Sequence, residues 1–259
     1  MNILLRCAFL GENFHGTQKQ PDRKTVQGEF EKALSCIYDQ KIKTVISSRL
    51  DAKVNALDFA LSFAVGKDLP LERLSYYLRR TLDRDIFLKE VREVSKDFSA
   101  RFSCKGKTYL YRIQNGKERN PLYNRFSFSP IKSLDEKKVE EGGRLFVGKH
   151  DFRSFATPEK EGENTILTLR SFSLSHEGPF LALRFEGESF LRYQVRFLVG
   201  ALMSFSEGKI TKETIQELLS GKIVPFRKYK ATGEGLTLER LEYEEKDLLP
   251  GCFPDSSPL

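Results

Sequence analysis

Residues 43–65, KTVISSRLDAKVNALDFALSFAV, decide the fold because they predict two strands separated by a charged loop. Residues 43–47 and 57–65 are apolar runs of strand length, rich in β-branched and aromatic side chains. The loop between them holds one carboxylate, Asp51, with a basic residue two positions away on each side. Nearby positive charge favours an ionised carboxylate, which suits a nucleophile or an electrostatic stabiliser better than a proton donor. The loop alone is better explained by solvated, incidental charges.

The elements around this stretch follow the order β-α-β-β-α-β. Residues 2–10 predict a strand, and a helix with one apolar face follows at 26–37. After the two strands beside the Asp51 loop, a proline opens a second helix at 70–82. Residues 86–94 then predict a strand with a charged face. This is the order of elements in ferredoxin-like folds.

The second half of the chain predicts the same order, although it shows no sequence repeat of the first half. A strand is followed by a helix that begins at a capping box, by two strands joined at a Gly-Pro turn, by two helices and by a closing strand. The strands are predicted at 107–114, 165–175, 180–186 and 236–243, and the helices from the capping box at 133–136 to about 146, at 190–205 and at 212–219.

We therefore expect an α+β fold of two ferredoxin-like halves, with mainly antiparallel sheets side by side and a central cleft. Ordinary α+β packing without duplication is the alternative. The predicted limits are 1–97 for an N-terminal subdomain that carries the Asp51 loop, 98–245 for a C-terminal subdomain, and 246–259 for a tail.

Composition limits the class of protein. A chain of 259 residues suits two subdomains or one large domain, and a hydrophobic content of 39% supports a folded core. Lys and Arg number 43 against 36 Asp and Glu, so the formal net charge is +7. This modest excess is compatible with a polyanion partner but does not require one.

Several kinds of site and location are disfavoured. The four cysteines are scattered without a C-x-x-C pair, which indicates free thiols in a reducing compartment. Three separated histidines argue against a metal centre. No apolar run is long enough to span a bilayer, and residues 1–10 lack the features of a secretory signal. We expect a cytoplasmic protein without a His-rich metal centre.

Four further segments carry basic and aromatic residues. Residues 98–113 join a basic turn to a strand with two tyrosines, which suits either an aromatic platform beside cations or core packing. Arg192 and Arg196 lie four apart on a helix, off its leucine face. Residues 226–230 alternate aromatic and basic side chains, and residues 14–20 form a polar segment whose glycine allows a close backbone approach. Each pattern has an ordinary structural explanation when taken alone.

Taken in order, these segments resemble the tRNA pseudouridine synthases of the A type (TruA), and the resemblance covers nearly the whole chain. Residues 14–20 resemble the family's Tyr-x-Gly-Trp-Gln-x-Gln segment, and a Thr-Val-Gln helix start follows at 25–27. Residues 48–56 match in part the signature Gly-Arg-Thr-Asp-x-Gly-Val-His-Ala. Further matches follow in the family order, at residues 98–113, 151–155, 190–200 and 231–238.

The resemblance implies roles for single residues. Asp51 aligns with the catalytic aspartate, and Tyr109 aligns with the tyrosine that stacks on the target uracil. Arg196 aligns with the arginine that pairs with the catalytic acid, and Arg49 with the signature arginine associated with nucleotide binding and flipping. Arg101 is a candidate for contact with the RNA backbone. The resemblance also implies a cofactor-free homodimer that isomerises uridines at positions 38, 39 and 40, in the anticodon stem-loop of tRNA.

The chain departs from the family pattern around the acid. Ser48, Leu50, Lys53 and Asn55 stand where the family has Gly, Thr, Gly and His, and Thr17 stands where it has Trp. A family glycine with positive φ would make the lysine a strained residue or an additional phosphate contact. We predict activity with an altered site preference or substrate range. The alternatives are a catalytically silent RNA-binding relative or tRNA chaperone, and an RRM-type module, which the lack of an RNP1-like strand disfavours.

Overall fold

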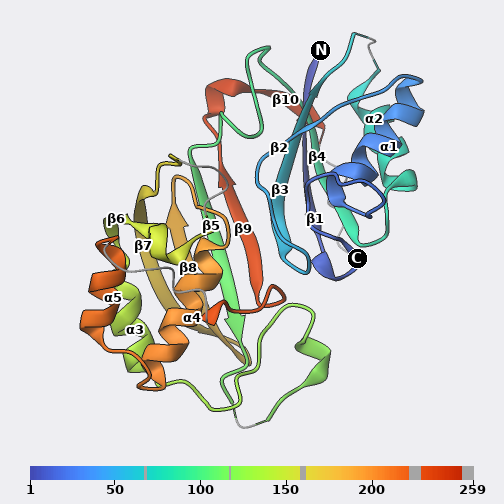
Figure 1. Ribbon diagram of the computed structural model, residues 1–259. Coiled ribbons are helices and arrows are strands. Elements are labelled where there is room, and N and C mark those ends of the chain that lie inside the picture. The colour runs from blue at the N-terminus through green and yellow to red at the C-terminus, as the bar shows by residue number, and fades with distance from the viewer. Residues whose placement is uncertain (67–68, 117, 158–161, 222–228, 253–259) are drawn as a thin grey trace. The chain divides into compact units, whose positions relative to one another are not determined.

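The computed structural model describes residues 1–66, 69–116, 118–157, 162–221 and 229–252, and it is a mixed α+β protein (Figure 1). Its strand pairs are mostly antiparallel, which confirms the predicted fold class. The chain forms two compact units: unit 1 is Met1–Lys105 with Leu238–Leu259, and unit 2 is Gly106–Thr237. Within the described ranges, every helix is too short or too polar to cross a membrane.

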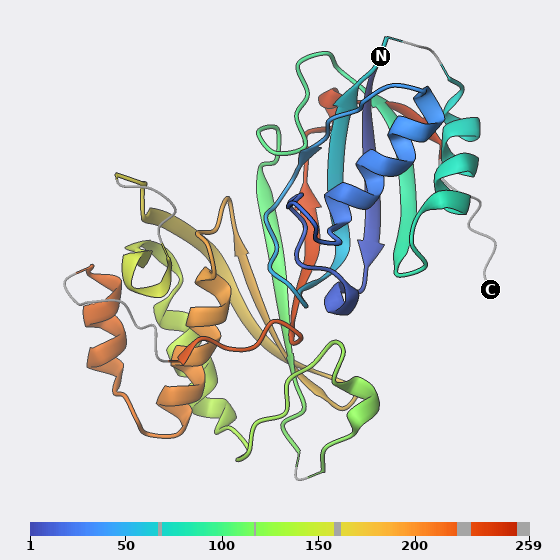
Figure 2. The ribbon, with the colours of Figure 1, turned by 45° about the vertical axis from the view of Figure 1, so that its right-hand side comes forward.

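Unit 1 has the predicted β-α-β-β-α-β order. Its elements are β1 (Asn2–Phe9), α1 (Val26–Tyr38), β2 (Val45–Ile46), β3 (Asn55–Ala64), α2 (Leu71–Thr81) and β4 (Ile86–Val94). Strand β1 lies between β4 and β3, and the short β2 pairs with β3. Strand β10 (Leu248–Cys252) extends the sheet beyond β4, and β9 (Leu236–Glu242) lies next to β3. Figure 2 shows α1 and α2 together on one face of this sheet.

Local sequence explains the two helices of unit 1. The hydroxyl of Thr25 accepts a hydrogen bond from the Gly28 N–H (3.2 Å), which caps the first turn of α1. The apolar face of α1 buries Phe30 and Leu34 completely, as the helical spacing predicts. Helix α2 buries Leu74 and Leu78 in the same way.

A buried carboxylate connects three strands of unit 1. Asp58 on β3 is 3% exposed, and it accepts a hydrogen bond from Nε of Arg6 on β1 (2.9 Å) and a second one from the same guanidinium. Its other contact is with β9, where the Leu241 N–H donates to Asp58 Oδ2 (2.9 Å). Glu90, also buried, pairs with Arg6 and with Arg92. Paired in this way, the charges remain buried in the sheet without the cost of an isolated ion.

We expect Asp58→Asn to lower the free energy of unfolding by about 3–5 kcal/mol, because it leaves the half-buried guanidinium of Arg6 without its full counter-charge. Urea denaturation at neutral pH measures this change. The control is Glu140→Gln in the exposed Glu140–Arg144 pair (2.5 Å), whose loss is expected to cost less than about 0.5 kcal/mol. Equal effects of the two substitutions would contradict the importance of the buried network.

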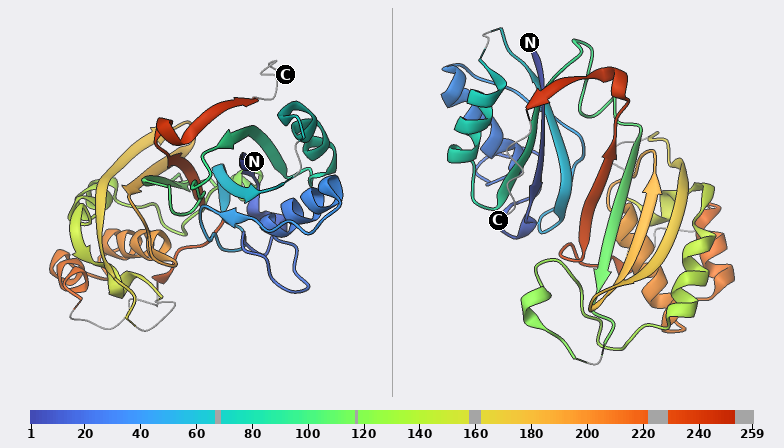
Figure 3. Two further views of the ribbon diagram at one scale, coloured as in Figure 1. Left: turned by 90° about the horizontal axis from the view of Figure 1, so that it is seen from above. Right: turned by 180° about the vertical axis from the view of Figure 1, so that it is seen from behind.

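The strands of unit 2 pair antiparallel with one another, and helices lie on one face of them (Figure 3). The strand order is β5-β8-β7-β6, and the Arg112 N–H donates to the Gly235 carbonyl (2.9 Å), so the segment that leads into β9 lies beside β5. Gly143 allows the ring of Phe172 to pack against α3, because a Cβ at this position would lie 2.0 Å from the ring. The elements are β5 (Gly106–Ile113), α3 (Glu136–Leu145), β6 (Gly148–Asp151), β7 (Ile166–Glu177), β8 (Phe180–Gly187), α4 (Gln194–Ser206) and α5 (Lys212–Leu219).

The compact units differ from the predicted segments 1–97, 98–245 and 246–259. The segment at 98–105 belongs to unit 1, where the Tyr243 hydroxyl donates to the Ala100 carbonyl (2.7 Å). The end of β9 and all of β10 also belong to unit 1. Residues 226–228 of the predicted aromatic and basic segment, and residues 253–259 of the predicted tail, lie outside the described residues.

Candidate active site

The predicted catalytic residue Asp51 lies in the loop between β2 and β3 of unit 1. Burial alternates along this loop: Ser48 and Leu50 are buried, Arg49 is exposed and Asp51 is half-buried. The Val54 N–H donates to the Asp51 carbonyl (3.2 Å), which closes a turn directly after the acid. Alternate side chains therefore anchor the loop in unit 1, while Arg49 and Asp51 reach its surface.

The hydroxyl of Thr17 holds this loop in place. Thr17 is fully buried, and its Oγ1 accepts a hydrogen bond from the Leu50 N–H (2.8 Å) and donates one to the Ser48 carbonyl (3.0 Å). The Thr17 N–H donates to the Leu50 carbonyl as well (3.0 Å). These three bonds fix the backbone of Ser48 and Leu50, on both sides of Arg49, and Leu50 directly precedes Asp51. Sequence reasoning noted Thr17 only as a departure from the family pattern and missed this role.

Two further departures from the family pattern, Lys53 and Asn55, also have a structural explanation. Lys53 has a φ of 70°, so this position does require the left-handed conformation that favours glycine. The Lys53 N–H donates to the Gly11 carbonyl (3.2 Å). Asn55 is buried, and its side-chain oxygen accepts the Gly11 N–H (2.8 Å). Both residues therefore connect the end of the loop to the segment that follows β1.

Tyr109, the predicted base-stacking residue, lies on β5 in unit 2. Its side chain is 7% exposed, and its ring contacts that of Phe190 edge to face, with centroids 5.0 Å apart. Tyr111, two residues further along the strand, is fully buried and donates its hydroxyl to the Thr232 carbonyl (3.2 Å). Burial raises the pKa of Tyr111 well above its usual range, so this phenol stays protonated.

Arg196 lies on the first turns of α4 in unit 2. Its Nε donates to the Ala231 carbonyl (2.8 Å), and the Ala231 N–H donates back to the Arg196 carbonyl (3.0 Å). The guanidinium carbon is 5.4 Å from the ring centroid of Tyr193. These contacts hold the stem of the side chain against the segment that precedes β9.

Arg101 occupies an exposed turn of unit 1, with its guanidinium carbon 5.3 Å from the ring centroid of Phe102. The ring is 78% exposed, so the pair forms a cation and aromatic surface. Of the predicted site residues, Arg49 and Asp51 share one loop, and Arg101 lies in a separate turn of the same unit. Tyr109 and Arg196 belong to unit 2.

Metal-binding clusters and cysteine thiols are two further kinds of reactive group that a site could use. Among the described residues, no cluster of three His, Cys, Asp or Glu side chains could hold a metal ion. Cys7, Cys36 and Cys104 are free thiols, and burial raises the pKa of the Cys7 thiol so that it stays protonated.

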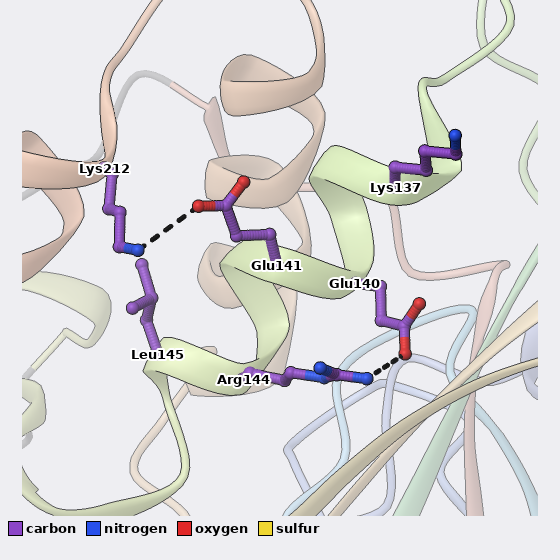
Figure 4. Close-up of a pocket in the computed structure, with 6 residues that line it drawn as sticks. All are labelled: Lys137, Glu140, Glu141, Arg144, Leu145 and Lys212. Atoms are coloured by element: carbon purple, nitrogen blue, oxygen red, sulfur yellow. Dashed lines mark hydrogen bonds and ion pairs between the residues drawn. The ribbon is translucent and has the colours of Figure 1, made fainter.

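A surface pocket between α3 and α5 contains none of the predicted site residues (Figure 4). Two ion pairs lie along its walls: Arg144 with Glu140 (2.5 Å), and Lys212 with Glu141 (3.2 Å). Because these charges already have partners, we assign the pocket no role in the chemistry.

Comparisons with known proteins show which family this chain is similar to. The family model described as tRNA pseudouridine synthase matches residues 7–103 and 144–244. The tRNA pseudouridine synthase A of Aquifex aeolicus (strain VF5) is 40% identical over 240 residues, covering 93% of this chain and 98% of that one. The protein of the same name from Geobacillus kaustophilus (strain HTA426) is 34% identical over 252 residues, covering 96% and 98%. A solved structure, the crystal structure of a Cbf5-Nop10-Gar1 complex, has a TM-score of 0.36 and 11% identity, covering 77% of this chain and 54% of that one.

The family model and the sequence relatives define a class, the RNA-modifying isomerases that rearrange uridine. Within this class, the chain belongs to the tRNA pseudouridine synthase family.

We expect Thr17→Val to lower the free energy of unfolding by about 1–3 kcal/mol, because it leaves the buried Leu50 N–H and Ser48 carbonyl without their partner. Thr17→Ser keeps the hydroxyl and loses one methyl group, so it is expected to cost only about 1 kcal/mol. Urea denaturation of both variants measures the difference. A serine variant as unstable as the valine variant would show that packing, and not the hydroxyl, holds the loop.

The conformation of Lys53 allows a second test. Lys53→Gly is expected to be more stable than Lys53→Ala by about 1 kcal/mol, because only the alanine variant keeps a Cβ at positive φ. Thermal unfolding of the two variants measures this difference. The idea fails if the alanine variant is the more stable one.

Proposed function

We propose that this protein converts uridine to pseudouridine in the anticodon stem-loop of tRNA, at positions 38, 39 and 40, with Asp51 as the catalytic carboxylate. The observation that carries the proposal is the Asp51 loop. It presents one half-buried carboxylate two residues from an exposed arginine, on a backbone anchored by the buried Thr17. A catalytic group on a rigid backbone loses little freedom when the substrate arrives.

The chemistry needs few participants. The bond between uracil N1 and the ribose C1′ breaks, and the base turns. A new bond then forms between C5 and C1′. C5 loses its proton, and N1 gains one. Atoms and electrons balance without an oxidant or a reductant. Asp51 would attack the sugar, attack the base, or stabilise charge as the glycosidic bond opens, and all three roles require an ionised carboxylate.

The remaining site residues would position the substrate. The target base must leave the RNA stack, which costs a few kcal/mol, and stacking on Tyr109 would recover about 1–3 kcal/mol of this. Arg196 would pair with the carboxylate, and Arg49 would contact the flipped nucleotide. Arg101 would contact the RNA backbone beside Phe102, as the exposure of this pair suggests.

We also propose that the protein is a cytoplasmic homodimer. The resemblance to the A-type synthases supports the dimer, and the free thiols of Cys7, Cys36 and Cys104 are compatible with a reducing compartment. Light scattering on the purified protein tests the oligomeric state. No observation favours a catalytically silent relative or a tRNA chaperone, and membership of an enzyme family argues against an RRM-type module.

Asp51→Ala is expected to lower the rate of pseudouridine formation in a tRNA transcript by more than about 1,000-fold, because it removes the only group proposed to act on the glycosidic bond. Binding of the transcript should change little. The control is Glu72→Gln, which neutralises an exposed acid on α2 and should keep the wild-type rate. If the wild-type protein forms no pseudouridine in any tRNA, or Asp51→Ala retains activity, the proposal is wrong.

A further inference from the structure

Four side chains gather where α4 begins in unit 2, and we call Arg192, Tyr193, Arg196 and Lys230 the Tyr193 cluster. The Lys230 Nζ lies 3.9 Å from the centroid of the Tyr193 ring. The guanidinium carbons of Arg192 and Arg196 lie 4.8 Å and 5.4 Å from the same centroid. One half-buried aromatic ring therefore contacts three cations.

Backbone contacts keep Lys230 in the cluster. The next residue, Ala231, exchanges two hydrogen bonds with Arg196, through the backbone N–H and the carbonyl. On the other side, the carbonyl of Tyr229 lies where a Cβ on Gly200 would stand, only 1.4 Å away, so only a glycine allows this approach. The segment around Lys230 is thus packed directly on α4, and the position of the ammonium group does not depend on its flexible stem alone.

Tyr193 has an unusual backbone conformation. Its φ is 65°, in the left-handed region that non-glycine residues seldom adopt, and it directly precedes α4. Strain of this kind persists where surrounding structure enforces it, and it is often found at binding sites. The Arg192 guanidinium donates to the Tyr193 hydroxyl (3.1 Å), so the tyrosine and its cation are oriented together.

The chemistry of the cluster suits a phosphate. A guanidinium presents a planar fork of N–H donors that matches two phosphate oxygens, and an ammonium adds a compact charge. Arg192 and Lys230 are exposed, so both groups can reach a ligand on the surface. Phosphate contacts of this kind fix the register of a nucleic acid without reading its bases.

We propose that Arg192, Tyr193 and Lys230 form a binding site for one backbone phosphate of the tRNA, separate in role from Arg196. The site rests on the proposed function, because tRNA is the polyanion that it would hold. It positions the strand, and the chemistry stays with Asp51. Its loss should therefore weaken binding without slowing the step in which the glycosidic bond rearranges.

The experiment compares full-length wild type with Arg192→Gln/Lys230→Gln. The dissociation constant for a tRNA transcript is measured between about 50 and 200 mM KCl, and the single-turnover rate is measured at saturating protein. The double variant should bind about 10-fold or more weakly at low salt, with the slope of log Kd against log salt reduced by about 1. Its single-turnover rate should equal that of wild type, and thermal unfolding verifies that it is folded.

Arg80→Gln is the matched control. It removes an exposed arginine on α2 whose guanidinium carbon lies 5.5 Å from the ring centroid of Tyr76, a contact with a single cation in unit 1. This variant should keep the wild-type slope. The proposal is wrong if the double variant keeps the wild-type slope of log Kd against log salt, or if Arg80→Gln reduces that slope as much as the double variant does.

Inorganic phosphate is added as a competitor of tRNA binding at constant ionic strength. This measurement distinguishes a site that binds free anions from a site that binds the RNA backbone. Inorganic phosphate that binds wild type but not the double variant, while the tRNA slope stays unchanged, assigns the cluster to small anions and overturns the proposal. Failure of the proposed function is a different result: wild type would then form no pseudouridine, whereas the effect of the double variant on the salt slope would remain.

Discussion

A charge buried in a β-sheet must be paired, and in unit 1 the pairing of Asp58 joins β9 to β1 and β3. Asp58 satisfies Arg6 with both carboxylate oxygens, and one of these oxygens also accepts the N–H of Leu241, which is 183 residues away. The placement of β9 beside β3 therefore also gives the buried Asp58 carboxylate a further donor. The platform that carries the Asp51 loop therefore includes residues from both ends of the chain.

The backbone of the Asp51 loop is held in place by residues that differ from the family pattern. In the position of the family tryptophan, Thr17 supplies a buried hydroxyl that bonds to the backbone on both sides of Arg49. Asn55, in place of the family histidine, bonds to Gly11. Polar groups at such buried positions are costly unless they are satisfied, and here both are. Thr17 and Asn55 therefore support the loop that carries Asp51. Compared with the family pattern alone, they are only two residues that do not match.

Local patterns predict much of this fold. The helical spacing of Phe30 and Leu34, the Thr25 cap and the ferredoxin-like order all depend on residues close in sequence. Features set by distant contacts were missed: the polar strand β6, the role of Thr17 and the return of β9 and β10 to unit 1. The predicted helix at 190–205 begins four residues later, because Tyr193 adopts a left-handed conformation. The assigned roles of Asp51, Tyr109, Arg196, Arg49 and Arg101 come from the resemblance and remain predictions.

The division of unit 1 between the two ends of the chain affects how the protein is made. Unit 2 is one continuous segment, so it can fold as soon as residues 106–237 have left the ribosome. Unit 1 begins synthesis first but must wait for residues 238–252, and until then the edges of β3 and β4 lack their last partners. Open strand edges invite pairing with other chains. The nascent protein is thus most exposed to aggregation while residues 1–237 have been made and β9 and β10 have not.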